Sequence, residues 1–363
     1  MSANEHFQFD MYDQGPRGSG EPGRLSGSGS GREVARPAWA DDDVVLAELV
    51  DRPGPEEAGQ YMAGPRKRRV FLPVTLFLLT CVSTFWVGAA QWLPHQHLNA
   101  YLVNKNLMPV RQAVIAHWDD GLVYMAALLG ILFAHEMGHF LATVRYGIPA
   151  SLPYFLPIPN TIGTLGAVIG MDGLRANRRE MFDIGIAGPL AGLVVAVPVM
   201  VLGVMNLDLT GPKFGGIALD SPLAVRVLLE YVHPPGYVPG ESISIGQLGG
   251  NPLFMAGWVG FLITGLNMLP VSQLDGGHVT YTLFGRRAHW IARLFVLSAF
   301  VFIFLAGAWI WIVMLSLVLL IGTDHPPTSN DRIPLGWPRR LIGYASLLIP
   351  VLCFPPLGLT ITL

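Results

Sequence analysis

The chain has 363 residues, of which 52% are hydrophobic and only 13% are charged. Several apolar runs of about twenty residues exclude a soluble globular domain and predict a polytopic membrane protein. The formal net charge of −2 is small, and we expect no nucleic-acid partner. The two cysteines, Cys81 and Cys353, both lie in apolar runs. This placement gives no sign of a disulfide framework, and two cysteines are too few for a zinc site built from cysteine clusters.

The N-terminal segment differs from the rest of the chain in charge and composition. Residues 1–60 contain 12 acidic and 5 basic residues, a net charge of −7, whereas the remainder contains 13 and 18, a net charge of +5. Because this segment is also rich in Gly, Ser and Pro, we expect a disordered acidic tail over residues 1–65. It lacks an Arg-rich, acid-poor transit peptide and an early apolar core, so nothing in it indicates cleavage or organelle import.

Residues 66–363 are predicted to form one transmembrane domain. We expect an all-α fold with about 6–7 transmembrane helices, which apolar segments place at residues 70–93, 121–144, 182–204, 251–270, 291–306, 308–321 and 341–362. The run 291–321 is too long for one span. Gly307 near its middle favours two helices joined by a tight turn over one long tilted helix.

The distribution of basic residues orients these spans. Arg66, Lys67, Arg68 and Arg69 directly precede the first span, which predicts a cytosolic N-terminus by the positive-inside rule. If the spans then alternate in direction, 14 of the 18 Lys and Arg residues after residue 60 lie at inner flanks or loops, and 4 lie outside. This imbalance supports the orientation.

The second span carries His135-Glu136-Met137-Gly138-His139. Positions i and i+4 lie on one face of a helix, so both imidazoles can bind one Zn²⁺, while Glu136 is placed to act on a water molecule. Ionisable groups within a span are costly unless they are functional. The alternatives are a chance HExxH sequence and a histidine that pairs helices.

The segment between the second and third spans is predicted to be non-helical. Four prolines within residues 149–159 favour extended backbone, and residues 163–173 form a short strand pattern punctuated by glycine. An open strand edge cannot face lipid, so the segment should pack on protein or line a cavity. Its free edge would suit an extended substrate. The alternative is an ordinary cytosolic loop.

Two polar segments are predicted to lie on the outer side. Residues 94–118 read as a connector or surface helix, in which His95 and His97 face opposite sides and are solvated. Residues 206–250 are about half the length of an independent 100-residue domain. We therefore expect this second segment to form a cap.

The fourth span ends in a sequence that predicts a broken helix. Pro270 and the pair Gly276-Gly277 imply irregular backbone, which membranes tolerate around a site. Asp275 is the natural third metal ligand there. The second and fourth spans both enter from outside, so His139 and Asp275 reach a similar depth on parallel helices. Two histidines, one aspartate and a water would give tetrahedral Zn²⁺ with an exchangeable position, as in catalytic sites.

Together these motifs resemble one family. The HExxH span, followed by Asn267-x-x-Pro270-x-x-x-Leu274-Asp275-Gly276-Gly277-His278, is similar to the site-2 protease family of intramembrane zinc metalloproteases. The resemblance covers about residues 121–285. It extends to three further stretches: Pro153-Tyr154-Phe155, Gly163-Thr164-Leu165-Gly166-Ala167 and Ala187-Gly188-Pro189-Leu190-Ala191-Gly192.

The resemblance implies roles for individual residues. One Zn²⁺ per chain is expected on His135, His139 and Asp275, with Glu136 as general base and proton shuttle. Asn267 is expected beside the site, where it positions substrate or the oxyanion. The glycine-punctuated stretch is expected to form a small membrane-embedded β-hairpin that receives substrate through Gly163, Thr164, Leu165, Gly166 and Ala167.

The chain departs from many bacterial relatives in one respect. Residues 206–250 are too few for the PDZ domain that those proteins carry between the third and fourth spans. The shorter architecture is similar to the PDZ-less branch found in bacteria and plastids. We expect a multi-pass protein of the bacterial cytoplasmic membrane, with membrane lipid and a transmembrane protein substrate as its partners.

The expected activity is that of a zinc metalloendopeptidase that cuts peptide bonds within or near transmembrane segments, as in regulated intramembrane proteolysis. Metal transport or sensing at the same His/Asp site is the alternative from another functional class, because such sites also serve ion pathways. A different membrane zinc protease would take its third ligand, a glutamate, from a later helix. A catalytically silent binder is disfavoured because every catalytic position is filled.

Overall fold

The computed structural model describes residues 70–213, 216–248, 250–271 and 273–361. The tail predicted over residues 1–65 lies outside these described residues, as does the basic run that precedes the first predicted span.

Four helices in the described part of the chain are long and apolar enough to cross a membrane. They are α2 (Phe71–Ala89), α5 (Trp118–Arg145), α6 (Arg178–Met205) and α10 (Arg287–Ala306). Shorter apolar helical segments follow α6 and α10, namely α8 (Pro252–Asn267), and η3 (Trp309–Trp311) with α11 (Ile312–Ile321). The mostly helical membrane fold is as predicted, but the number of six to seven spans is not confirmed.

Two breaks divide the C-terminal part of the chain. Gly307 has φ of 66°, a left-handed conformation that ends α10 and separates it from η3. Residues 341–362, predicted as one span, do not form one continuous helix. They are divided among α12 (Trp337–Ser346), α13 (Ile349–Cys353) and β5 (Leu359–Ile361). Pro350 lies in the first turn of α13, and Pro355 follows its end, as expected for a residue that cannot continue a helix.

Local sequence defines the ends of the two helices that matter most for the site. Asp119 and Asp120 lie in the first turn of α5 and Arg145 in its last turn, charges that complement the helix dipole. A capping box begins α6. The side-chain oxygen of Asn177 accepts from the Glu180 N–H at 3.2 Å, and the Glu180 carboxylate accepts from the Asn177 N–H at 2.9 Å.

The core lies where α5, α6 and α8 meet. α5 packs against α2, α6 and α8, and α6 packs against α8 and α9 (Asp275–Phe284). The largest fully buried side chains include Tyr124 of α5, Phe182 of α6 and Trp258 of α8. Most of α8 is buried. It is therefore surrounded by protein, although it is too short to be counted with the four long helices.

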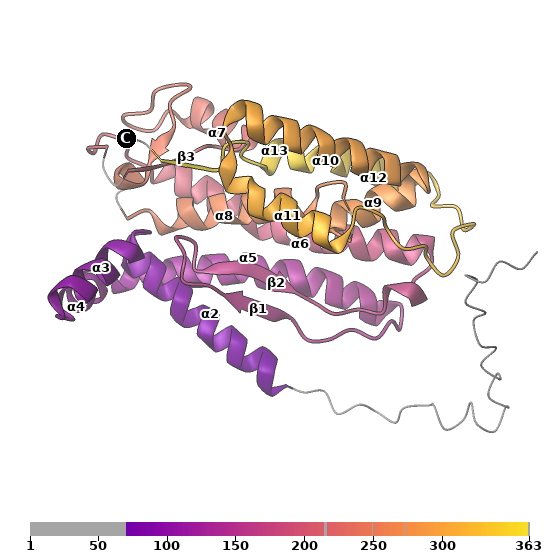
Figure 1. The fold of residues 1–363 in the computed structure, drawn as a ribbon, viewed down its shortest axis with the longest axis horizontal. Helices are drawn as coiled ribbons and strands as arrows, with labels where there is room; N and C mark the ends of the chain where they lie inside the picture. Colours follow the sequence, from indigo (N-terminus) through magenta and orange to yellow (C-terminus); the bar gives the residue numbers. More distant parts are fainter. Residues whose placement is uncertain (1–69, 214–215, 249, 272, 362–363) are drawn as a thin grey trace, which may run out of the picture. The chain divides into compact units, whose positions relative to one another are not determined.

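A two-stranded antiparallel hairpin, β1 (Tyr154–Pro157) and β2 (Thr164–Val168), lies beside α2 and α5 (Figure 1). Tyr154 is opposite Val168, with an irregular step before Pro157 pairs with Thr164. Two helix side chains hold its turn: the Ser83 hydroxyl donates to the Gly163 carbonyl at 2.6 Å, and the Tyr124 hydroxyl to the Ile162 carbonyl at 2.8 Å. The small hairpin expected from the glycine pattern is present.

A second, three-stranded sheet was not predicted. β3 (Ile217–Leu219) pairs antiparallel with both β4 (Ile243–Ser244) and β5. α7 (Leu223–Val232) and η2 (Ile245–Leu248) complete the segment predicted as a cap. All-α was therefore too simple a description, because strands of two or three residues are too short to show an alternating pattern.

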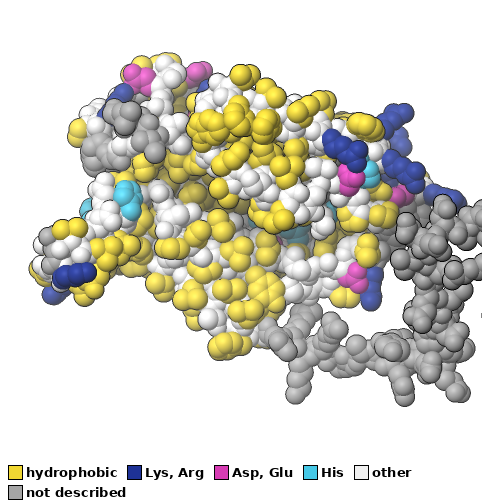
Figure 2. All heavy atoms as spheres, in the orientation of Figure 1, with side chains coloured by type: hydrophobic (Ala, Val, Ile, Leu, Met, Phe, Trp, Pro, Cys, Tyr) yellow, Lys and Arg dark blue, Asp and Glu magenta, His cyan; other side chains and the backbone are white. Residues whose placement is uncertain are grey.

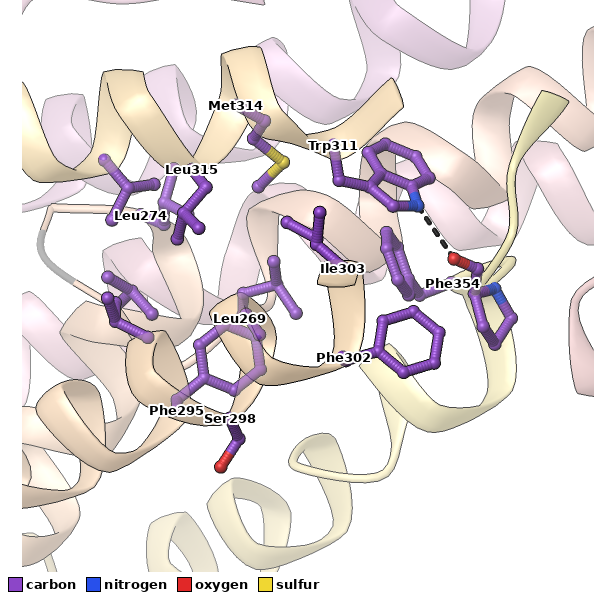
Figure 3. Close-up of a pocket in the computed structure, with 15 residues that line it drawn as sticks. Leu269, Leu274, Phe295, Ser298, Phe302, Ile303, Trp311, Met314, Leu315 and Phe354 are labelled. Carbon is purple, nitrogen blue, oxygen red and sulfur yellow. Dashed lines mark hydrogen bonds between the residues drawn. The ribbon is translucent and has the colours of Figure 1, made fainter. Parts of the chain in front are cut away.

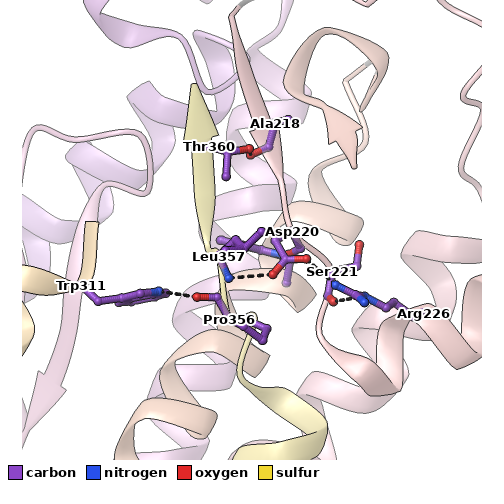
Figure 4. Close-up of polar contacts among 9 residues, drawn as sticks. Ala218, Asp220, Ser221, Arg226, Trp311, Pro356, Leu357 and Thr360 are labelled. Carbon is purple, nitrogen blue, oxygen red and sulfur yellow. Dashed lines mark hydrogen bonds and ion pairs between the residues drawn. The ribbon is translucent and has the colours of Figure 1, made fainter. Parts of the chain in front are cut away.

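Asp220 connects this cap to the rest of the fold (Figure 4). Its carboxylate accepts from the Arg226 guanidinium at 2.6 Å and from the Leu357 N–H at 2.8 Å. The Trp258 indole N–H donates to its backbone carbonyl at 2.8 Å. One buried residue thus joins β3, α7, α8 and the segment before β5.

The surface is apolar along most of the face shown in Figure 2, and basic side chains gather at the end where α9 and α12 lie. Arg178 and Arg179 at the start of α6 bond there to carbonyls of residues 282, 331 and 334. Two short helices, α3 (Pro94–Asn104) and α4 (Met108–Ala116), occupy the connector predicted over 94–118, and η1 (Gly173–Arg175) precedes α6.

Candidate metal centre

The HExxH sequence lies on α5, as predicted, and its histidines meet at one point. The Nε2 atoms of His135 and His139 are 3.2 Å apart, and both side chains are buried. One helical turn separates the two residues, so their side chains lie on the same face. α5 therefore supplies a pair of imidazole nitrogens directed at a common position.

Asp275 completes the cluster from α9, of which it is the first residue. Its Oδ2 is 3.2 Å from His135 Nε2, and its Oδ1 is 3.3 Å from His139 Nε2. Two ligand atoms about 2.05 Å from one zinc ion at a tetrahedral angle are about 3.3 Å apart. The spacing of these three donors therefore fits Zn²⁺. In the described part of the chain this is the one group of three or more His, Cys, Asp or Glu side chains placed to hold a metal.

The break between α8 and α9 gives Asp275 its position. The chain turns twice here, through a 2.8 Å bond from the Val271 N–H to the Leu269 carbonyl and a 3.2 Å bond from Leu274 to Val271. A Cβ atom at residue 276 would lie 2.0 Å from the Met268 carbonyl oxygen. Gly276 therefore permits the close approach that returns the chain to the site.

The hydrogen bonds around the cluster orient its ligand atoms. His139 Nδ1 lies 2.8 Å from the Ile184 carbonyl oxygen. A carbonyl only accepts, so Nδ1 carries the proton and neutral His139 presents the lone pair of Nε2 to the cluster, as metal-bound histidines do. Asn267, the last residue of α8, places Nδ2 3.3 Å from His135 Nε2. The residue predicted to lie beside the site thus does so.

A stripe of three glycines on α6 makes room for histidines, a role that sequence reasoning missed. A Cβ at Gly188 would lie 2.0 Å from His139 Nε2, and one at Gly192 would lie 3.1 Å from His135 Nδ1. A Cβ at Gly185 would lie 2.9 Å from the Cβ of His278. The small residues of α6 allow close helix packing, as expected, and these three glycines also leave room for the histidine side chains.

Glu136 is buried beside His135 and His139, and all three side chains line one cavity of about 170 Å³. This cavity also includes the end of β2, at Ala167 and Val168. Of the five residues predicted to receive substrate, Ala167 lines the cavity. Thr164 is buried and donates its hydroxyl hydrogen to the Leu156 carbonyl at 2.9 Å, while Leu165 is exposed. Sequence reasoning did not place Gln273 or Val168 in the lining.

His278, which also lines the cavity, contacts a loop that sequence reasoning did not connect to the site. Its Nδ1 lies 2.5 Å from Nε2 of His325, in the 322–336 loop between α11 and α12. His325 is buried and stacks on Tyr281 of α9, with ring centroids 4.5 Å apart. No spacing in the sequence relates residues 278 and 325, so only the fold could reveal this contact.

Comparisons with known proteins agree with this centre. The model of peptidase family M50 matches residues 123–314. A protein named probable zinc metalloprotease EGY1, chloroplastic, from Arabidopsis thaliana is 30% identical over 321 residues, which cover 86% of this chain and 56% of that protein. Its namesake from Oryza sativa subsp. japonica is 28% identical, with 86% and 53% covered. A protein named probable zinc metalloprotease EGY2, chloroplastic, from A. thaliana is 30% identical over 46% of this chain and 30% of its own length.

The chain spans about half the length of the EGY1 relatives it matches. No solved structure matches it. The plant relatives are named as chloroplastic, so they lend no support to a bacterial cytoplasmic membrane, which stays a prediction from the sequence. The apolar helices support an integral membrane protein.

Proposed function

Because the chain belongs to peptidase family M50, the site-2 protease family of zinc metalloproteases, we propose that it is an intramembrane endopeptidase. Its substrates would be membrane proteins, cut within or near their transmembrane segments. The observation that carries the proposal is the meeting of His135, His139 and Asp275, whose ligand atoms all lie within 4.8 Å of one another, in a cavity shared with Glu136. Metal binding alone does not need the buried glutamate.

The residues of the chain have distinct parts in the proposed reaction. His135, His139 and Asp275 would hold one Zn²⁺, which acidifies a water molecule and polarises a peptide carbonyl when bound. Glu136 takes a proton from the attacking water as the water oxygen adds to the carbonyl carbon of the peptide bond. As the C–N bond breaks, Glu136 gives that proton to the leaving amine nitrogen. Asn267 lies where an amide N–H can hold the substrate or its developing oxyanion.

The hairpin supports an extended mode of substrate binding. Among the described residues β2 pairs with β1 alone, so no second strand lies along its other edge, where a peptide could add as a further strand. Ala167 and Val168 carry that edge into the cavity that holds Glu136. A transmembrane helix hides its carbonyls in internal hydrogen bonds. Unwinding onto β2 would therefore expose the bond to be cut.

The proposal is tested by replacing Glu136 with Gln. Loss of the general base should lower proteolysis by roughly 10²–10⁴-fold, while zinc content stays unchanged because Glu136 is not a ligand. The measurement is a comparison of membrane-protein fragments in cells carrying wild type or Glu136→Gln, together with zinc content of the purified proteins. Glu230→Gln makes the same chemical change at an exposed position of α7 and should leave cleavage intact.

The same experiment separates peptidase activity from metal transport or sensing. A transporter needs the histidines and Asp275 but has no use for a proton shuttle between water and an amine. Unchanged fragments in the Glu136→Gln cells, with zinc bound, would exclude the peptidase.

A further inference from the structure

A second cavity, of about 310 Å³, lies between α10, α11 and the segment that joins α8 to α9 (Figure 3). Of the fifteen described residues that line it, only Ser298 and Trp311 have a side-chain nitrogen or oxygen. Both are already bonded: the Ser298 hydroxyl donates to the Leu294 carbonyl at 2.8 Å, and the Trp311 indole to the Pro356 carbonyl at 2.8 Å. The lining side chains therefore offer no free hydrogen-bond donor to a ligand, and their polar atoms are too few to hold a water molecule well.

The mouth of this cavity opens toward the surface that faces lipid. Phe302 of α10 lines the cavity and is 39% exposed. Around it α10 and α11 expose other large apolar side chains, such as Val301 and Val313. α10 is long and apolar enough to span a membrane. In a bilayer the medium at such a surface is hydrocarbon.

We propose that this cavity is a binding site for one acyl chain of a membrane lipid. Apolar cavities remain dry and take up apolar ligands, and acyl chains are the apolar molecules present in bulk around α10 and α11. A hydrocarbon chain is also much thinner than a helix, which is about 10 Å wide with its side chains.

The position of the cavity relates it to the metal centre. Leu269, Val271 and Leu274 form one wall, and they belong to the irregular segment between Asn267 and Asp275. Leu274 also lines the cavity of the metal centre. The bound chain thus packs behind the segment that presents the third ligand. This binding requires only that α10 and α11 lie in a bilayer, so it is independent of the proposed peptidase activity.

The test uses the full chain in lipid nanodiscs that contain a phospholipid with a diazirine in the middle of one acyl chain. After illumination, mass spectrometry maps the labelled residues. We expect adducts on Phe295, Phe302 and Met314, which line the cavity. Ala299→Phe fills the cavity and should lower these adducts about ten-fold, equivalent to about 1.4 kcal/mol of binding. Ala299→Leu adds less volume and keeps the test available if the larger variant does not fold.

The matched control is Val301→Phe, which adds bulk to the exposed face of α10 and should leave the adducts in the cavity unchanged. Equal labelling of the cavity in wild type and both Ala299 variants would overturn the proposal. So would labelling confined to outward residues such as Val301. A parallel reaction uses a transmembrane peptide with a photoreactive leucine. Labelling of the cavity by this peptide, with none by the lipid, would also overturn the proposal and would assign the cavity to a substrate side chain.

Discussion

At the candidate metal centre, the position of the His139 imidazole depends on the absence of a side chain at Gly188. A methyl group at this position would overlap His139 Nε2, at a distance of 2.0 Å, so His139 would have to leave its place. We expect Gly188→Ala to lower zinc affinity by at least roughly the 10–100-fold that the loss of an outer-sphere partner causes. Zinc titration of the purified protein measures this change. Gly130→Ala is the matched control on α5, where a Cβ meets nothing within 4 Å. Equal zinc affinity in the two variants would contradict the role given to Gly188.

Asp275 allows the ligand set itself to be tested. Asp275→Asn removes the negative charge but keeps the shape, so zinc affinity should fall by more than the roughly 10–100-fold expected for an outer partner. Metal analysis after dialysis against a weak chelator provides the measurement. Asp119→Asn changes an exposed aspartate at the start of α5 in the same way and should retain zinc. Full zinc content in Asp275→Asn would contradict the role of Asp275 as third ligand.

At this scale the sequence predicted which residues meet at the candidate metal centre, namely His135, His139 and Asp275, and missed their surroundings. The i, i+4 spacing of His135 and His139 determines a shared face on any helix, and the break after Pro270 marked Asp275. The close contact between Gly188 and His139 is made between two different helices, α6 and α5. Nothing in a single sequence indicates which glycine contacts which imidazole. The contact between His278 and His325 was invisible for the same reason.

The 322–336 loop is an element whose attachment to α9 should depend on pH. Burial, the largest influence, lowers the pKa of His325 from its ordinary value of 6.5, while a backbone hydrogen bond to Pro326 acts in the opposite direction. Because the pKa is lower in the attached loop than in a detached one, the detached loop binds more protons at mildly acidic pH. The loop should therefore stay attached to α9 above about pH 6.5, and its attachment should weaken as the pH falls below that value.

Hydrogen exchange of residues 322–336 at about pH 7.5 and about pH 5, corrected for the intrinsic exchange rate, measures this change. His325→Phe keeps a ring to stack on Tyr281 and removes the titrating group, so its loop protection should vary less between the two conditions. A loop that is equally protected at both pH values in wild type would contradict the expectation.

Predictability from sequence also differed among elements. The long apolar runs predicted α2, α5, α6 and α10 because hydrophobic length is a strong local signal. β3, β4 and β5 contain only two or three residues each, and their pairing depends on contacts between distant segments. The prolines in residues 341–362 lack the backbone N–H that a continuous helix needs. The prediction of one span there rested instead on the high hydrophobicity of the segment.

For the whole molecule, Asp220 provides a test of how the cap is attached. Asp220→Ala would remove the acceptor for Arg226 and for the Leu357 N–H. We expect the free energy of unfolding to fall by about 1–3 kcal/mol, seen as a lower Tm in detergent or nanodiscs. Asp208→Ala removes an exposed aspartate that bonds only locally, to Thr210, and should lower Tm much less. Equal shifts in the two variants would mean that Asp220 does not join the cap to the fold.

The pairing of β3 with β5 has a consequence for biosynthesis. The Thr360 hydroxyl reaches the Ala218 carbonyl across 142 residues of chain, so β3 leaves the ribosome long before its partner strand. At about 5–20 residues per second this delay is roughly 7–28 s. Throughout that interval one edge of β3 lacks its native partner while α10 and α11 are still being inserted. A ribosome stalled before β5 should therefore yield a nascent chain whose cap is more sensitive to added protease than that of the released protein.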